Sequence, residues 1–498
     1  MFKTFNDFAE QTRALRSSER NSIQGSSQEQ TGEAVKRPDV IILGAGIAGL
    51  VAAERLCARG ASVLMLEARD RIGGRVWTLH DERFAMPVEL GAEFVHGRPE
   101  ATWNLLRRFG LVAYDLPFEH WERLRGRLRL AENFEELLGQ AMAGLGRLKH
   151  DMSFAAYLRE HRAGRHLADA RKTATDFVEG FDAADPERVS AKSIAAEQEE
   201  LGDVSNETQF RLRAGYAELA DRLRSEIEPG RFNLRLRTVV HGVRWAKGHV
   251  EVLTHAAPAS SRARPRLPQG DGVIFRAAKV LVTLPVGVLQ VPPERPGAVR
   301  FEPELPAKRA ALNLLGSGPV VKAVIKFREA FWESPAAARA AGLSTTGKER
   351  AGKDLRDMSF LHDPDAAFPT WWTQRPLRLP VLTAWAGGPT AVALSGLSPA
   401  AITDAAVGSL SALLGQSPAR LRRLIERVRT HDWPADPFSR GAYSYELVGA
   451  GKARRRLAAP VDRTLFFAGE ATDTQGQAST VAGAIASGER AADEILRR

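Results

Sequence analysis

The chain has 498 residues, of which 44% are hydrophobic and 26% are charged, and its formal net charge is +10. A chain of this length is too long for one ordinary core, so we expect two domains of a soluble globular protein. The sequence contains no apolar run long enough for a membrane helix, and residues 1–37 lack the pattern of a secretory signal. Cys57 is the single cysteine, which excludes an intrachain disulfide and favours a cytoplasmic location.

The positive charge comes mostly from arginines that are spread along the whole chain. A basic block or tail would indicate a nucleic acid or an anionic membrane as partner. Because the arginines form no such block, we interpret the charge as a generally Arg-rich surface and expect no nucleic-acid partner and no membrane anchor. The positive excess also counts slightly against a substrate that carries several positive charges.

The first part of the chain predicts a leader followed by a strand–helix–strand unit. Residues 1–37 include a segment rich in Ser, Gln, Glu and Gly, which is typical of a flexible leader. The apolar run over 40–43 predicts a strand that is buried on both faces. A helical pattern over 50–59 ends at Gly60, and residues 62–67 predict a second strand.

Three glycines lie between the first strand and the helix, where Gly44, Gly46 and Gly49 form the pattern G-x-G-x-x-G. Glycine permits a tight turn and lets backbone N–H groups approach a pyrophosphate at the positive end of the helix. Glu67 ends the second strand, close to the roughly 20-residue spacing expected of an acid that binds ribose hydroxyls. This arrangement predicts a dinucleotide site, and the acid argues against NADP.

A second glycine turn follows Glu67 directly. It runs from Arg69 through Gly73 and Gly74 to Arg75, so it ends in a cation. Such a loop beside the first one suits a cofactor that lies extended across the domain, although an ordinary solvated turn could have the same composition. At this point NAD and FAD are both open.

The rest of the chain alternates between helical and strand-like segments. Residues from about 100 to 230 have helical spacing, whereas 233–283 are strand-like, apart from an expected exposed loop at 256–272. A second mixed segment follows as far as about 434, and the chain closes with a predicted strand at 464–468 and a helix at 480–496. Strand–helix units at both ends and in the middle predict an α/β fold, in which a discontinuous nucleotide-binding domain carries substrate-domain insertions.

Residues 320–327 predict a strand with a lysine in apolar company. Side chains alternate along a strand, so Lys322, Val324 and Lys326 share one face. Burying a lysine is costly, which makes Lys322 a candidate functional group. We interpret Lys326 as an edge lysine that extends to solvent.

Several separated motifs resemble those of the FAD-dependent amine oxidase family, which includes monoamine oxidases, polyamine oxidases and lysine-specific histone demethylases. Residues 67–78 resemble the family's second glycine turn, residues 89–97 the stretch beside the flavin ring, and residues 239–240 the strand that touches the adenine. Residues 466–472 and 479–484 resemble the C-terminal flavin motif. These motifs occur in the family's order and are most similar to those of polyamine oxidases.

This resemblance implies a Rossmann-like FAD-binding domain, discontinuous, with an inserted mixed α+β substrate-binding domain. The FAD-binding domain would comprise residues 38–98, 231–291 and 435–498, and the substrate-binding domain residues 99–230 and 292–434. FAD would be non-covalent, because Ala442 occupies the place where monoamine oxidases attach flavin through cysteine.

By the same resemblance, Glu67 would hold the adenosine ribose, Arg75 the pyrophosphate region and Glu470 the ribityl–phosphate region. The helix that opens at Val481 would point its positive end at the flavin pyrimidine. The predicted cofactor-binding residues are Gly44, Gly46, Gly49, Glu67, Arg69, Gly74, Arg75, Gly91, Ala92, Glu93, Phe94, Val240, Glu470, Thr480 and Val481. The pattern predicts no metal site.

For the reaction, the resemblance points to Lys322, Tyr443, Thr480 and His96 as catalytic residues. Lys322 would contact the flavin N5 through a water. Tyr443 would flank the amine in front of the flavin, because an aromatic face attracts a cationic amine. Thr480 would form the opposite wall, where monoamine oxidases have an aromatic residue, and Tyr445 is an alternative to Tyr443.

Two polar residues beside the flavin stretch have two interpretations each. His96 lies where animal polyamine oxidases have a histidine that helps to bind the substrate amine, although a lone histidine is as often structural. Glu93 could complement a second amine, or it could contribute only its backbone to the flavin site. The sequence does not assign Trp371, Trp372 or Trp385 beyond the substrate domain.

The implied reaction is oxidation of an amine C–N bond to an imine, which is hydrolysed to a carbonyl compound plus ammonia or a smaller amine. Oxygen would be reduced to hydrogen peroxide, so the partners are a small-molecule amine and oxygen.

Three alternatives remain. An L-amino-acid oxidase would need an arginine to clamp the substrate carboxylate, and Phe94 follows Glu93 where that arginine usually stands. A dehydrogenase or desaturase of the protoporphyrinogen or carotenoid type shares the FAD loops but does not need Lys322 and Tyr443. A flavin-stabilised protein that binds nucleic acid or chromatin would need an added module, and the sequence contains no long heptad insertion.

Overall fold

The computed structural model describes residues 37–124, 126–205, 208–257, 272–295, 297–343 and 355–497. The predicted leader, except for Arg37, and most of the expected loop at 256–272 lie outside the described residues. Within the described part of the chain, no helix is both long and apolar enough to span a membrane.

A five-stranded parallel sheet carries the N-terminal glycine turn. Its order is β10 (Phe232–Arg235), β2 (Val63–Leu66), β1 (Val40–Leu43), β14 (Lys279–Val282) and β23 (Leu465–Phe467). All neighbouring strands are parallel. In chain order this is 3-2-1-4-5, the Rossmann arrangement, whose ligand crevice lies where the strand order reverses beside β1. Its strands all come from the ranges predicted for the FAD-binding domain, while the division into two domains stays a prediction.

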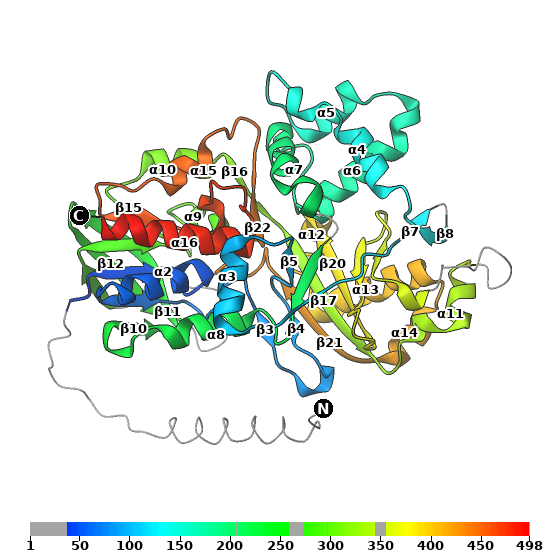
Figure 1. Ribbon diagram of the computed structural model, residues 1–498, viewed down its shortest axis with the longest axis horizontal. Helices are drawn as coiled ribbons and strands as arrows, with labels where there is room; N and C mark the ends of the chain where they lie inside the picture. Colours follow the sequence, from blue (N-terminus) through cyan, green and yellow to red (C-terminus); the bar gives the residue numbers. More distant parts are fainter. Residues whose placement is uncertain are drawn as a thin grey trace. The chain divides into compact units, whose positions relative to one another are not determined.

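Both faces of this sheet are covered, because the strands β1, β2 and β23 are apolar at every position. Val40 and Ile42 pack with the helices α2 (Ile47–Ala58), α8 (Ala217–Glu226) and α16 (Val481–Leu496). Ile41 and Leu43 pack on the opposite face with β11 (Thr238–Ala246) and β12 (His249–Ala256). Those two strands form a second sheet with β13 (Ile274–Ala277) and β15 (Arg300–Glu302). Figure 1 shows α16 beside α2, so the first and last helices of the FAD motifs are neighbours.

A seven-stranded sheet forms the other main layer. Its order is β21 (Ile425–Asp432), β17 (Val320–Phe327), β20 (Val381–Gly387), β19 (Thr370–Trp372), β18 (Phe360–His362), β7 (His120–Leu124) and β8 (Arg127–Leu130). On one face, Val321, Ala323 and Ile325 pack against α13 (Pro399–Leu414) and α14 (Pro418–Leu424). Val324 belongs to a different cluster, as expected for the face that it shares with Lys322.

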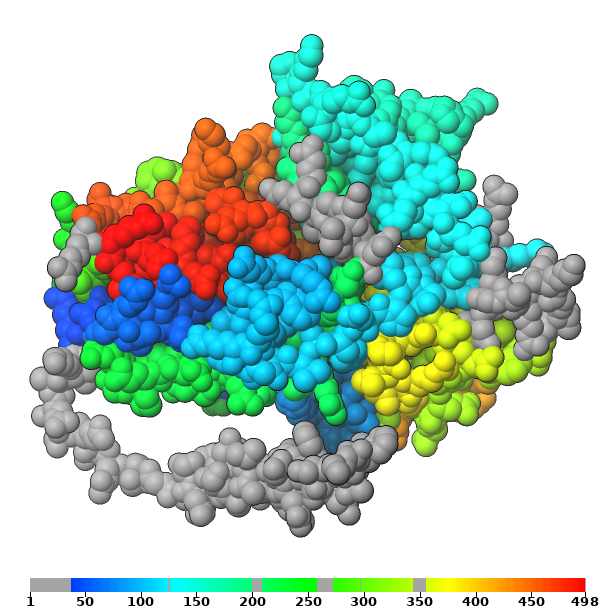
Figure 2. All heavy atoms as spheres, viewed as in Figure 1, coloured from blue at the N-terminus to red at the C-terminus, as the bar shows by residue number. Residues whose placement is uncertain are grey.

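The segment expected to be helical, 100–230, contains both helices and strands. The helices are α3 (Glu100–Phe109), α4 (Phe134–Met142), α5 (Phe154–His161), α6 (Ala168–Gly180), α7 (Ala191–Ser205) and α8. The helices α4, α5, α6 and α7 pack around one core, and in the space-filling view α4 to α6 form a lobe at the top (Figure 2). Sequence reasoning missed β6 (Ala113–Asp115) and β9 (Gln209–Leu212), whose pairing partners are distant in sequence, and it missed the hairpin of β7 and β8, which joins the large sheet through the distant strand β18.

Smaller paired strands link the layers. The strand β5 (Phe94–His96) pairs with β9, and β9 also pairs with β6. The strand β16 (Leu315–Gly318) pairs with β22 (Tyr443–Glu446), and β3 (Thr78–Leu79) pairs with β4 (Val88–Glu89). The remaining helices include α9 (Val286–Leu289), α10 (Pro306–Leu312), α11 (Pro335–Ala340), α12 (Gly388–Leu394) and α15 (Ala453–Ala458).

Candidate active site

One cavity of about 2130 Å³ extends from the two glycine turns to the seven-stranded sheet. Pockets for drug-sized ligands occupy roughly 300–1,000 Å³, so this cavity has room for a dinucleotide and a substrate together. Every residue that the sequence predicted for the cofactor or the chemistry lines it, with the exception of Gly49.

Gly49 contributes through packing. It lies in the first turn of α2, and a Cβ at this position would stand 2.3 Å from the Gly44 carbonyl oxygen and 3.3 Å from Ile42 Cγ2. Only glycine lets the helix approach the strand and the turn this closely. The N-cap residue Gly46 provides no side-chain cap, so first-turn N–H groups of α2 face the turn without a side-chain acceptor.

Glu67 holds the two glycine turns together at the end of β2. One carboxylate oxygen accepts a hydrogen bond from Ala45 N at 2.8 Å, and the other accepts from Arg69 N at 2.8 Å. Gly73 N donates to Ala45 O at 2.8 Å, which joins the turns directly. The Arg69 guanidinium is turned to Asp436, at 2.8 Å, and to Ser439.

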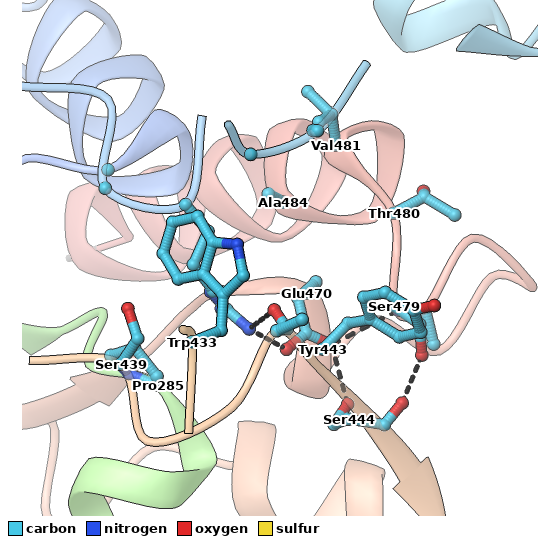
Figure 3. Close-up of a pocket in the computed structure, with 18 of the residues that line it drawn as sticks. Pro285, Trp433, Ser439, Tyr443, Ser444, Glu470, Ser479, Thr480, Val481 and Ala484 are labelled. Atoms are coloured by element: carbon cyan, nitrogen blue, oxygen red, sulfur yellow. Dashed lines mark hydrogen bonds and ion pairs between the residues drawn. The ribbon is translucent and has the colours of Figure 1, made fainter. Parts of the chain in front are cut away.

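Arg75 and Glu470 form a partly buried ion pair at 2.7 Å, rather than facing the cavity separately. Ser444 Oγ donates to the other Glu470 oxygen at 2.6 Å, and Ser479 N donates to it at 3.2 Å. Burial acts to raise the pKa of Glu470, but Arg75 and Arg454 hold it below its ordinary value. Figure 3 shows Glu470 and Ser444 below the start of α16, and the pair with Arg75 connects Glu470 to the second glycine turn.

These features fit FAD. The uncapped start of α2 suits a pyrophosphate, Glu67 lines the cavity at the ribose end, and Val240 lines it from β11. The helix α16 begins at Val481, as predicted, and Val481 lines the cavity. The long path between Glu67 and α16 matches an extended dinucleotide that carries a flavin.

Lys322 is fully buried and belongs to a network that the sequence did not predict. Its Nζ donates to Glu93 Oε2 at 2.7 Å and to Gly91 O at 3.3 Å. Arg211 Nε and Trp372 Nε1 donate to Glu93 Oε1 at 2.8 and 2.9 Å. The Glu93 carboxylate therefore binds donors of this chain, which favours a structural role over the interpretation that it complements a second amine. Lys326, in contrast, is partly exposed and pairs with Glu426, but β17 lies between β21 and β20, so the interpretation of Lys326 as an edge-strand lysine was wrong.

The side chains of Tyr443 and Tyr445, both in β22, have different surroundings. The Tyr443 hydroxyl donates to Phe181 O at 2.6 Å, and its ring packs with Trp385 and Trp433 beside the cavity. Tyr445 packs in the core of α4 to α7. Tyr443 is therefore the better candidate for the aromatic wall.

Thr480 is the N-cap of α16. Its hydroxyl accepts from Gly483 N at 3.1 Å and donates to Gln477 O at 2.7 Å. Thr480 lines the cavity beside Val481 (Figure 3), but its hydroxyl is engaged in capping the helix.

His96 lies among aromatic rings, with Phe181 at 5.3 Å and Phe94 at 6.1 Å between ring centroids. Burial lowers the pKa of the His96 imidazole to about 4, so the ring is neutral at physiological pH. A neutral imidazole can accept a hydrogen bond from an amine.

The seven-stranded sheet turns one face to the cavity. Lys322, Trp385, Thr370 and His362 lie opposite one another on successive strands, and all of them line the cavity. Trp372 and Trp385 stand beside Lys322, whereas Trp371 points to the opposite core. Side chains alternate along β19, so the sequence could have indicated that Trp371 and Trp372 face opposite sides of the sheet. Only the pairing register of the strands shows that the inward-facing tryptophan lies beside Lys322.

The wall formed by residues 118–197 and 360–390 is acidic, which the sequence reasoning missed. Among the described residues that line it there is neither Lys nor Arg, and its carboxyl groups belong to Glu122, Glu135, Asp176, Glu179, Asp182 and Glu197. Burial raises the pKa of Asp176 to about 7, against the effect of Lys172. Burial and then Glu197 raise the pKa of Asp182 well above its ordinary value. Burial raises the pKa of Tyr443 most, and Asp182 and Glu197 raise it further. These two carboxyls therefore lie near the aromatic wall.

A Rossmann sheet, two glycine turns and a closing helix around one long cavity define an FAD-binding oxidoreductase. The family model for flavin-containing amine oxidoreductases matches residues 47–496, so the chain belongs to that family.

Relatives and solved structures extend this result. Polyamine oxidase 4 of Oryza sativa subsp. japonica is 28% identical over 491 residues, which cover 93% of this chain and 89% of the relative. Lysine-specific histone demethylase 2 of Homo sapiens is 27% identical over 511 residues, which cover 92% of this chain and 53% of that protein. Wild-type putrescine oxidase bound to putrescine shares the fold, with a TM-score of 0.72 at 20% identity, covering 93% of this chain and 100% of that one.

The chain is therefore an FAD-dependent amine oxidase that acts on a small-molecule amine and uses oxygen. The family assignment agrees with the resemblance drawn from the sequence motifs.

Proposed function

We propose that this amine oxidase acts on a diamine or polyamine, whose reacting nitrogen lies near Tyr443 and whose second nitrogen lies along the acidic wall. The observation that carries the proposal is the composition of that wall, which has carboxyl groups and, among its described lining residues, no Lys or Arg. The polyamine oxidases among the relatives and the fold shared with putrescine oxidase support it.

Asp182 is the strongest single contact for a second ammonium group. It is 9% exposed, and no hydrogen-bond donor or cation among the described residues pairs with its carboxyl. A buried carboxyl without a counter-ion is costly to ionise, and an incoming ammonium group removes that cost. The aromatic faces of Phe177 and Phe181 stand on the same wall and also attract cations.

The net charge of the whole chain had counted against a polycation. The carboxyl groups of the wall outweigh the net charge of the chain. Electric fields act strongly over the few ångströms inside a cavity, whereas they are screened over longer distances at the surface. The same wall disfavours an amino-acid substrate, since it would place the substrate carboxylate among other carboxyls without a guanidinium clamp.

The bound FAD supplies the two-electron acceptor for the oxidation. The chain's own groups bind and orient the amine. The Tyr443 ring flanks it, the neutral His96 accepts a hydrogen bond from it, and the apolar rings around the site limit the access of water. Lys322 supplies a fixed positive charge beside the loop at 91–94. A cytoplasmic location stays a prediction.

The test compares α,ω-diamines with monoamines of equal chain length, by anaerobic flavin reduction and by peroxide release. We expect the wild type to prefer diamines. Asp182→Asn should raise the KM for diamines by about 10- to 100-fold, since a hydrogen bond to a charged group contributes roughly 1.5–3 kcal/mol.

The same variant should leave the KM for monoamines within about threefold of the wild type. Asp404→Asn is the control, because Asp404 is an exposed acid that pairs with Arg422 far from the cavity lining. A wild type that oxidises monoamines as well as diamines would refute the proposal.

A further inference from the structure

A buried group of three charged side chains lies beside the amine-oxidation site. Lys322 and Arg211 both pair with Glu93, at 2.7 and 2.8 Å, and their side chains are 0%, 6% and 5% exposed, respectively. Hereafter we call Lys322, Glu93 and Arg211 the charged triad.

Three distant parts of the chain bring these residues together. Glu93 immediately precedes β5, and Arg211 lies in β9 directly opposite Phe94. Lys322 lies in β17, on the cavity face of the seven-stranded sheet. Arg211 also donates to Thr373 O at 3.1 Å and to Arg375 O at 3.2 Å, so it joins β9 to the chain beyond β19.

The Glu93 carboxylate is shared among three donors. Oε1 accepts from Arg211 and from Trp372 Nε1, and Oε2 accepts from Lys322. Burial acts to raise the pKa of Glu93, but Lys322 and Arg211 outweigh burial and hold it below its ordinary value. The triad thus contains one anion and two cations, which leaves one positive charge without a counter-ion inside the triad.

The carboxylate also fixes an aromatic ring. Its bond to Trp372 Nε1 holds the indole 5.3 Å from Lys322 Nζ and 5.4 Å from the Phe94 ring. Without Glu93, the indole N–H would lose its acceptor, and the lysine would keep only the Gly91 carbonyl at 3.3 Å. One side chain therefore sets the positions of a cation and of an aromatic wall.

We infer that Glu93 and Arg211 are positioning residues of the oxidation site, which hold Lys322 and Trp372 in place and give the loop at Gly91–Phe94 a net positive field. This inference rests on FAD lying against that loop, whose residues line the cavity and whose Gly91 carbonyl accepts from Lys322. A buried positive field favours negative charge on the reduced cofactor, because little solvent screens it.

The test measures the reduction potential of FAD in the intact holoenzyme for a series of triad charges. Arg211→Met removes one cation, and Glu93→Gln removes the anion. We expect the potential to fall below that of the wild type in Arg211→Met and to rise above it in Glu93→Gln. Arg211→Lys keeps the charge and should restore the wild-type potential.

The opposite signs separate a field from general damage, since disordering the site would shift both variants in the same direction. Equal shifts, or no shift in either variant, would overturn the inference. If Glu93→Gln does not fold, the comparison of Arg211→Met with Arg211→Lys decides alone. Identical reduction potentials in these two variants would overturn the inference.

Arg490→Met is the matched control, because Arg490 is a part-buried arginine that pairs with Glu494 at 3.0 Å outside the cavity lining. Its potential should equal that of the wild type. The reduction potentials of FAD do not depend on which amine is oxidised. They therefore test this inference even if the diamine proposal fails.

Discussion

At the scale of single residues, the site depends on charges that are buried in pairs. Lys322 tolerates complete burial because Glu93 accepts a hydrogen bond from its ammonium group, and Glu93 tolerates it because Arg211 supplies a second cation. Asp182 differs, because none of the described residues provides it with a counter-ion. The Glu93 carboxylate organises the protein, whereas the Asp182 carboxyl is the one that we propose binds the substrate.

Lys322→Met tests the role of the lysine. The variant should keep its FAD, because Arg211 still neutralises Glu93. Amine-dependent flavin reduction or reoxidation should slow by about 10- to 100-fold, which is the rate factor that corresponds to the free energy of a hydrogen bond to a charged group. Stopped-flow absorbance of both half-reactions measures this. Lys326→Met is the control on the same strand, since Lys326 pairs with Glu426 at the surface. Wild-type rates in both half-reactions would remove Lys322 from the chemistry.

At the scale of secondary-structure elements, the FAD site depends on how closely α2 approaches β1. Gly49 makes this approach possible, because a side chain there would collide with the Gly44 carbonyl. The helices α2 and α16 then pack on the same face of the parallel sheet and bring the first and last motifs of the chain together. Helix–sheet packing therefore connects segments that are separated by most of the sequence.

Gly49→Ala should push α2 away from the turn, lower the melting temperature and release FAD. The matched control is Gly139→Ala in α4, where a Cβ meets no heavy atom within 4 Å. Removing a helical glycine without a clash should stabilise the protein by about 0.5–1 kcal/mol. Thermal unfolding and the FAD-to-protein absorbance ratio give both answers. A Gly49→Ala protein with full FAD content would contradict the close-packing argument.

At the scale of the whole molecule, the charge is divided between the surface and the interior. The chain carries +10 in total, yet the wall formed by residues 118–197 and 360–390 is acidic, and carboxyls with raised pKa values are buried elsewhere. Glu89 is an example. It accepts hydrogen bonds from Tyr216 N and Thr78, and burial raises its pKa to about 7 despite both donors.

The contribution of Glu89 to stability should therefore be lost as the pH rises from about 4.5 through 7, whereas the buried His96, whose pKa is lowered, acts in the opposite direction. A carboxyl whose pKa is higher in the folded state binds more protons when folded, so raising the pH favours unfolding. Glu89→Gln should flatten this dependence by an amount on the order of 1–3 kcal/mol. Urea denaturation at several pH values measures it, with Asp404→Asn as an exposed control. An unchanged slope in Glu89→Gln would show that Glu89 is ionised in the folded protein.

Denaturation should release free FAD from the chain. Ala442 lines the cavity where a cysteinyl attachment would be needed, and Cys57, the single cysteine, is buried in α2 and does not line the cavity. After acid precipitation we expect a colourless pellet and a yellow supernatant. Flavin that stays with the pellet would show a covalent bond.

The sequence alone determined that the chain has a dinucleotide site, and it determined the framework of that site. The glycine spacing, the apolar run over 40–43 and Glu67 at the end of the next strand are short-range patterns, and backbone geometry allows few other structures for them. The sequence also predicted the helix that begins at Val481. It predicted the burial of Lys322, because the residues on both sides of it are apolar.

Only the tertiary structure decided the partners of these residues. Arg211 meets Glu93 because β9 pairs with β5, and Trp372 meets Lys322 because β19 and β17 both flank β20. The acidic wall combines residues from several elements, and their common face cannot be read from any one of them. The physical reason is that local propensity sets turns, strands and helices, whereas the pairing register of distant strands depends on packing throughout the core.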